Sequence, residues 1–168
     1  IALENIAEKL LVACRNHPQG CPQAMPRGFN MVVHEFQCPF RMYKCFAAKC
    51  SWTGRSNEVL LHTETNHKER VIIGSEKEFK IKKLDNRSEL DMTFLFSCEH
   101  GDFWAKFIFK KKEAVFLGAV QYIGKLESSS TFKYIFEISS SDNFSEKVFK
   151  YSRKTHADIM SFETIFES

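Results

Sequence analysis

The sequence predicts two small metal-stapled modules followed by an all-β antiparallel sandwich. Two observations lead to this fold class. Eight cysteine and histidine residues recur at ordered spacings between residues 14 and 67, and alternating apolar residues fill the chain from Val71 onward. Ordered Cys and His spacings are typical of metal ligands, and period-two alternation is typical of strands with one buried face. The change of character predicts a domain boundary near residue 70.

Composition and charge exclude several classes of protein. Residues 1–70 hold nine Lys/Arg and six Asp/Glu, and the rest of the chain holds fifteen of each. This balance does not produce the strongly basic surface of a nucleic-acid binder. No apolar run reaches the roughly 18 residues of a membrane span. Because no basic region precedes an apolar one at the N-terminus, we expect no signal peptide and a cytoplasmic protein, with the nucleus as a second compartment.

Residues 1–13 predict a short amphipathic helix. Leu3, Ile6, Leu10 and Leu11 recur at helical spacing, and charged and amide side chains occupy the opposite side. Such a helix must bury its apolar stripe against another part of the protein. We therefore expect a linker helix that contacts either the first module or a domain upstream.

The metal-ligand string divides into two sets of four. The first set is Cys14, Cys21, His34 and Cys38, and the second is Cys45, Cys50, His62 and His67. Zinc prefers four tetrahedral nitrogen and sulfur ligands in structural sites, and each set offers two close pairs separated by a longer insert. Both sets use all four positions and leave none open for water, so we expect two structural zinc ions. In the second set, residues 57–61 predict a helix that presents its histidines.

The cysteine and histidine residues also have other interpretations. The eight residues could instead be buried thiols and surface histidines that bind no metal. They could also belong to a DNA-reading finger, but the predicted helix carries Glu58 and no arginine. His17 is interpreted as solvated. Cys98 lies two residues before His100, an arrangement that fits a nucleophile, but a small strand-end hydrophobe is favoured. No set of residues predicts a catalytic centre.

Runs of alternating apolar residues after Val71 predict strands bounded by turn-forming clusters. They cover Phe79–Lys82, Met92–Phe96, Phe103–Lys110, Phe132–Ile138 and Val148–Tyr151. In the third run, Trp104 and Ile108 occupy the second face. An apolar second face indicates either a strand that forms an interface or a central strand covered on both sides.

These residues resemble the seven-in-absentia (Sina/Siah) family of RING-type ubiquitin ligases. The resemblance lies in the eight-ligand string, in Trp52 two residues after Cys50, and in the Phe-rich β segment. Three further segments are similar to family segments that follow the RING: Ile1–Ala7, Ser97–Phe103 and Gly118–Gly124. The chain departs from the family by one extra residue between Cys21 and His34, and the match ends after Tyr151.

The resemblance implies tandem zinc fingers over residues 14–70 and a TRAF-like substrate-binding sandwich, complete or truncated, over residues 71–168. The chain would be the substrate-recognition and dimerisation region of a Siah-like E3 ligase that targets bound proteins for degradation. A RING is not among these 168 residues, so an E2 enzyme would dock upstream of them. The alternative is a non-enzymatic adaptor.

The resemblance also implies a homodimer and a groove for protein or peptide partners. The groove positions are Asn57, Val71, Ile73, Met92 and Phe94. Asn57 stands where the family has an acidic residue, and Met92 stands where it has tryptophan. The groove stays apolar, but these replacements imply a different peptide motif.

Overall fold

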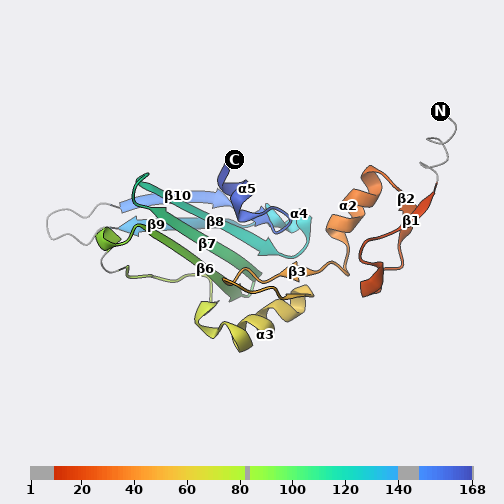
Figure 1. Ribbon diagram of the computed structural model, residues 1–168, viewed down its shortest axis with the longest axis horizontal. Helices are drawn as coiled ribbons and strands as arrows, with labels where there is room; N and C mark the ends of the chain where they lie inside the picture. Colours follow the sequence, from red (N-terminus) through yellow and green to blue (C-terminus); the bar gives the residue numbers. More distant parts are fainter. Residues whose placement is uncertain (1–9, 82–83, 140–147, 168) are drawn as a thin grey trace. The chain divides into compact units, whose positions relative to one another are not determined.

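The computed structural model describes residues 10–81, 84–139 and 148–167 (Figure 1). The chain divides into two compact units, residues 1–45 with 51–59 and residues 46–50 with 60–168. Phe46 belongs to the second unit because its ring packs against the rings of Trp104 and Phe162, with centroids 5.8 and 5.2 Å away. The domain boundaries predicted near residues 13 and 70 stay predictions.

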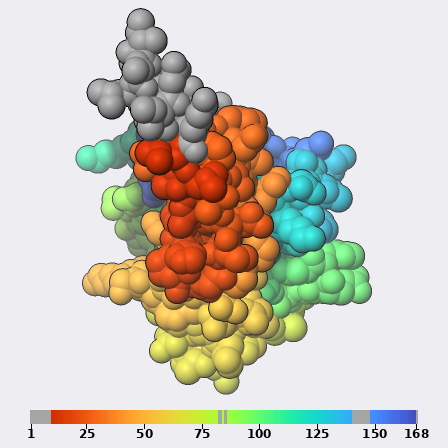
Figure 2. Space-filling model, turned by 90° about the vertical axis from the view of Figure 1, so that its right-hand side faces the viewer, coloured from red at the N-terminus to blue at the C-terminus, as the bar shows by residue number. Residues whose placement is uncertain are grey.

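The first unit consists of two small antiparallel strand pairs and short helices, and Figure 2 shows its surface in red and orange. Its elements are β1 (Leu11–Ala13), η1 (His17–Gln19), β2 (Ala24–Pro26), α2 (Phe29–Gln37), β3 (Tyr43–Lys44), β4 (Thr53–Gly54) and the start of α3 (Ser56–Asn66). β1 pairs with β2, and β3 pairs with β4. The buried core is Cys14, Cys21, Met31 and Cys38. An apolar core this small needs a further source of stability, such as a bound metal ion.

The helix predicted over residues 1–13 falls mostly outside the described residues. Its end is described and is not helical, because Leu11–Ala13 forms strand β1. Val12 pairs with Met25 of β2, and both side chains pack against the cysteine-rich core. Burial of Val12 on this core therefore determines the local backbone, in place of the helical periodicity of the sequence.

A five-stranded sheet in the order β11-β8-β7-β6-β5 forms the centre of the second unit. Its strands are β5 (Val71–Ile73), β6 (Glu89–Cys98), β7 (Gly101–Lys110), β8 (Val115–Ile123) and β11 (His156–Ala157). The three long strands are antiparallel neighbours, whereas the short edge strands β5 and β11 pair in parallel with β6 and β8. β9 (Lys133–Ser139) and β10 (Val148–Lys154) form a second antiparallel layer. The predicted fold class, zinc-finger modules followed by a β-sandwich, is confirmed.

One predicted strand is absent from its expected position. Phe79 to Ile81 form no strand in the structure, although their apolar residues alternate. The ring of Phe79 instead packs against the rings of Phe94 and Phe107, at centroid distances of 4.6 and 6.1 Å. An aromatic side chain can thus bury itself on a sheet from a coil segment, and alternation alone does not distinguish the two cases.

Aromatic side chains fill the space between the sheet and the β9–β10 layer. The buried residues there are Phe103, Ala105, Val120 and Tyr134. Phe107 and Phe136 cross the layers with ring centroids 4.6 Å apart. Burial raises the pKa of Tyr134 to about 12, so its phenol stays protonated and donates a hydrogen bond to the Gly118 carbonyl oxygen at 3.4 Å.

The opposite face of the sheet is covered as well. Trp104 is 1% exposed and packs against Phe46, which in turn packs against Phe162 at the start of α5 (Phe162–Glu167). Gln121, paired with Trp104 in register, is fully buried and donates its side-chain amide to the carbonyl oxygen of Met160. β7 is therefore a central strand covered on both sides, and its second face is not an exposed interface.

The remaining elements of the second unit are short. They are the end of α3, η2 (Lys68–Arg70), η3 (Leu84–Asn86) and α4 (Leu126–Ser129). Among the residues described, no helix is both long and apolar enough to cross a membrane.

We expect Gly118→Ala to destabilise the sandwich. A Cβ at this position would lie 2.4 Å from the ring of Phe136, a distance that the ring cannot accommodate without moving. Overpacking of this kind costs about 1–3 kcal/mol, which chemical denaturation of the chain would measure. In a Phe136→Leu background the same substitution should cost clearly less, and an equal cost in both backgrounds would contradict the steric explanation.

Candidate metal centres

The first predicted ligand set converges in the first unit. Cys14 follows β1, Cys21 follows η1, His34 lies in α2, and Cys38 caps the end of α2. Their ligand atoms all lie within 4.8 Å of one another. The Sγ atoms of Cys14 and Cys38 are 3.9 Å apart, and Sγ of Cys21 is 3.4 Å from Nε2 of His34. Tetrahedral zinc places two sulfurs about 3.8 Å apart and a sulfur about 3.6 Å from a nitrogen, so these atoms fit the ion.

Asn16, which sequence reasoning missed, contacts both cysteines at the start of this centre. Its backbone N–H and its side-chain amide donate to Sγ of Cys14 at 3.4 and 3.6 Å, and its carbonyl oxygen accepts from the Cys21 N–H at 3.1 Å. The residue is 7% exposed. Burial raises the pKa of the Cys14 thiol, and the Asn16 N–H is the largest opposing influence. A small amide residue two positions after a cysteine is the signal that could have identified it.

His17 lies beside the first centre and is not one of its four grouped residues. Its Nδ1 lies 2.8 Å from the carbonyl oxygen of Cys21, a ligand residue. The contact requires the tautomer that carries a proton on Nδ1. His17 therefore supports the loop that carries Cys21, a role that its interpretation as a solvated side chain did not include.

The second predicted ligand set also converges. The ligand atoms of Cys45, Cys50, His62 and His67 lie within 4.8 Å of one another. Sγ of Cys50 is 3.4 Å from Nε2 of His62, and the two imidazole rings have centroids 5.4 Å apart. His62 lies in α3, which includes the helix predicted at residues 57–61, and His67 follows the end of α3.

His62 and His67 are in states that suit binding of a metal ion. Nε2 of His67 is buried and has no hydrogen-bond partner among the described residues. Burial, followed by the neighbouring charge of His67, lowers the pKa of His62, so its ring is neutral at pH 7. A neutral imidazole offers a lone pair to zinc, and a buried unpartnered nitrogen needs such a partner.

Two zinc ions with structural roles account for these features. Each group provides four nitrogen or sulfur donors and so completes a tetrahedral shell. Water activation by zinc requires an open coordination position, which a complete shell of protein ligands lacks. The zinc ions expected from the sequence are confirmed, and their chemistry is to hold the surrounding loops in place.

The five residues predicted to line a peptide groove are not brought together on one surface of the sheet. Val71 pairs with Leu95 in register, so Val71 and Ile73 lie on the face that carries Leu95. Met92 and Phe94 lie on the opposite face, since they are an odd number of positions from Leu95 along β6. Asn57 lies separately in α3. Peptide binding by these residues stays a prediction.

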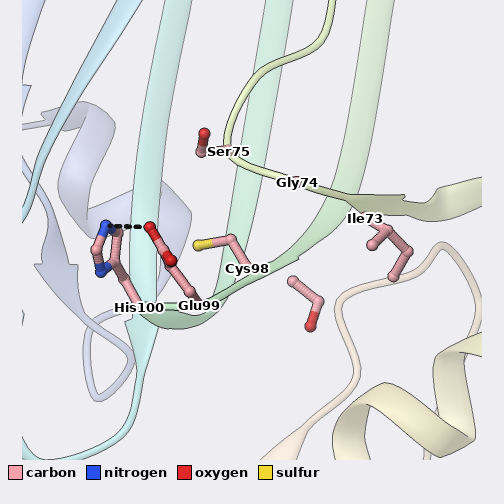
Figure 3. A pocket seen from close by; sticks show the side chains of 7 residues that line it. Ile73, Gly74, Ser75, Cys98, Glu99 and His100 are labelled. Carbon is pink, nitrogen blue, oxygen red and sulfur yellow. Dashed lines mark ion pairs between the residues drawn. The ribbon is translucent and has the colours of Figure 1, made fainter.

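A pocket at the ends of β5 and β6 contains Cys98 and His100 (Figure 3). The two side chains do not form a nucleophile–base pair in this pocket. Sγ of Cys98 contacts the carbonyl oxygen of Gly101 at 3.6 Å, and His100 forms an ion pair of 3.5 Å with Glu99. Cys98 packs against the aromatic cluster, which agrees with its interpretation as a small hydrophobe.

Comparison with known proteins finds similarity to one family. Residues 5–81 match the family described as "Sina, zinc finger". The chain is 27% identical over 145 residues to the E3 ubiquitin-protein ligase sina of Schistosoma mansoni, covering 82% of this chain and 38% of that protein. Residues 5–81 are therefore a Sina-type zinc-finger region, and the chain as a whole is similar to Sina/Siah E3 ubiquitin-protein ligases. The two Cys/His groups are thus the centres of Sina-type zinc fingers.

Two plant proteins have a similar level of sequence identity to this chain. SINAT4 of Arabidopsis thaliana, an E3 ubiquitin-protein ligase, is 25% identical over 150 residues, which are 84% of this chain and 45% of that protein. SINAT2 of the same plant, also an E3 ubiquitin-protein ligase, is 29% identical over 146 residues, which are 82% of this chain and 47% of that protein. The chain therefore spans less than half the length of these Sina/Siah relatives.

We expect metal analysis of the purified chain to find two zinc ions. Cys50→Ser should reduce the content to one, because it removes a ligand from a complete shell, and should unfold the second centre. Cys98→Ser is the matched control, and it should retain both zinc ions because Cys98 belongs to neither group of ligands. A wild-type chain with one zinc ion or none would refute the ligand assignment.

We expect Asn16→Ala to weaken the first centre selectively. Loss of an amide that orients a ligand costs roughly tenfold or more in metal affinity. Mass spectrometry of alkylated cysteines under chelator challenge should show earlier release of Cys14, Cys21 and Cys38 than in wild type. Asn66→Ala serves as the counterpart because Asn66 Nδ2 lies 3.2 Å from Nδ1 of His62, and it should act on Cys45 and Cys50. Equal release patterns in the two variants would contradict the assignment of Asn16.

Proposed function

We propose that this chain is the substrate-recognition and dimerisation region of a Siah-like E3 ubiquitin-protein ligase. In this role it targets bound proteins for ubiquitination and proteasomal degradation. The observation that carries the proposal is the succession of two four-donor zinc centres and a β-sandwich in one chain. Its likeness to proteins named as E3 ubiquitin ligases over 82% of its length supports the same role.

The geometry indicates that this region contributes to ubiquitin transfer by positioning a substrate. Because both proposed zinc shells are complete and Cys98 is not paired with His100, no side chain described above is set up for chemistry. A region of this kind promotes ubiquitin transfer by holding a substrate near an E2 enzyme bound elsewhere in the longer protein. Tethering raises the effective concentration of the substrate lysine and limits its orientations. The E2 would bind through a RING upstream, in the cytoplasm or the nucleus.

The eight grouped residues are the proposed zinc ligands, and the homodimer is proposed from the family resemblance alone. The second face of β7 does not supply the dimer interface, because Trp104 is covered within the chain. The sandwich remains the part of the chain through which two copies would associate. Analytical ultracentrifugation at micromolar concentration should find a dimer, and a monomer alone would remove this part of the proposal.

We expect the full-length protein to assemble ubiquitin chains when it is incubated with E1, several E2 enzymes and ubiquitin. It should also modify a protein captured by the 168-residue chain, because recognition and transfer then lie in one molecule. A full-length variant lacking residues 71–168 should keep self-ubiquitination and lose modification of the captured protein. If the captured protein binds but no E2 supports modification of either protein, the chain belongs to an adaptor and the ligase proposal is wrong.

A further inference from the structure

Strands β9 and β10, which lie side by side in Figure 1, carry Lys133, Lys150 and Lys154 on one face of their layer. The inner face of this layer packs its tyrosines and Phe136 into the aromatic core. Alternation along the strands turns the intervening side chains outward, and all of these are exposed. We call six of them the lysine face: Lys133, Ile135, Glu137, Lys150, Ser152 and Lys154.

Two lysines of this face oppose each other across the strand pair. Lys133 and Lys154 are directly paired in the strand register, and like charges in that position destabilise a strand pair. Neither forms an ion pair with a described residue, and the same holds for Arg153. Lys150 differs, because its Nζ lies 3.4 Å from a carboxylate oxygen of Glu137. The face therefore carries excess positive charge at the Lys133–Lys154 end.

An apolar position lies between the charged ends of the lysine face. Ile135 is 56% exposed and pairs with Ser152, whose short side chain leaves one flank of the isoleucine open. Along one strand, positions two apart on one face are separated by about 6.7 Å. Ile135 thus has Lys133 on one side and Glu137 on the other at that spacing. A segment with an apolar residue and with acidic residues on the Lys133 side of it matches this order of groups.

We propose that the lysine face binds an acidic segment of a partner protein, with an apolar residue placed against Ile135 and carboxylates against Lys133 and Lys154. The proposal gives the recognition role proposed above a class of partner, and it rests on that role. A second copy of the same face fits less well, since a two-fold axis would bring lysines against lysines. Nucleic acid also fits less well, because so few free cations neutralise few phosphates.

The first test is binding of a fluorescein-labelled peptide, Gly-Asp-Asp-Leu-Asp-Asp-Gly, to the 168-residue chain at low ionic strength. The double variant Lys133→Glu/Lys154→Glu should weaken binding by about tenfold, because two attractive charge pairs become repulsive. Added salt should weaken wild-type binding, as expected for exposed charges. The matched control is Lys77→Glu/Lys112→Glu, which changes the net charge equally at two other exposed lysines and should change binding less than about twofold.

A second variant separates binding from stability. Lys154→Glu alone places an opposite charge across from Lys133, so it should raise the melting temperature while it weakens peptide binding. If these lysines only solvate the surface, the melting temperature should rise and peptide binding should stay the same. That result would overturn the proposal.

Three further results would also overturn it. They are equal binding of a peptide with asparagine in place of aspartate, equal weakening by the control variant, and binding to phosphatidylserine vesicles in the absence of peptide binding. Peptide binding by a protein that builds no ubiquitin chains would refute the ligase function and leave the lysine face as an acidic-peptide site. Ubiquitination of a captured protein without peptide binding would refute this inference alone.

Discussion

Coordination of buried sulfur by a metal ion is the interaction on which the first unit depends. Three of its four core residues are cysteines, so the groups that would bind zinc are also the groups that fill the interior. Without the ion, this core would consist of Met31 and three crowded thiols, which is too little apolar area to order a loop-rich segment. The positions of β1, η1 and α2 follow from this constraint, because each element places a ligand of the first centre at the same point.

The β-sandwich of the second unit is stabilised by apolar packing. Its stability comes from aromatic rings packed on both faces of a five-stranded sheet. Because Phe46 and the β9–β10 layer cover the two faces of the sheet at β7, the buried residues Trp104 and Phe103 have no free surface for a partner. The proposed recognition of a partner would then fall to the outer side of the second layer. In such an arrangement the core residues stabilise the fold, and other residues at the surface would contact a partner.

Much of the architecture could be predicted from the sequence, because the determining signals are local. The spacing of the eight Cys and His residues predicted two groups that the structure brings together, and alternation predicted β6, β7, β9 and β10. Other features depend on contacts between distant residues. Phe46 covers Trp104 across 58 positions, and register alone places Val71 and Met92 on opposite faces of the sheet. Asn16 was missed because its function lies in hydrogen bonds that composition does not reveal.

The short connection between the second zinc centre and the sheet limits how this protein can change in evolution. His67 is followed by the single turn η2, closed by a 2.8 Å hydrogen bond from the Arg70 N–H to the His67 carbonyl oxygen, and β5 then begins at Val71. In β5 only Ile72 is buried. Inserting one residue before Val71 would reverse the facing of every side chain in this strand and expose Ile72. Lineages of this protein can therefore exchange side chains in this connection much more readily than they can alter its length.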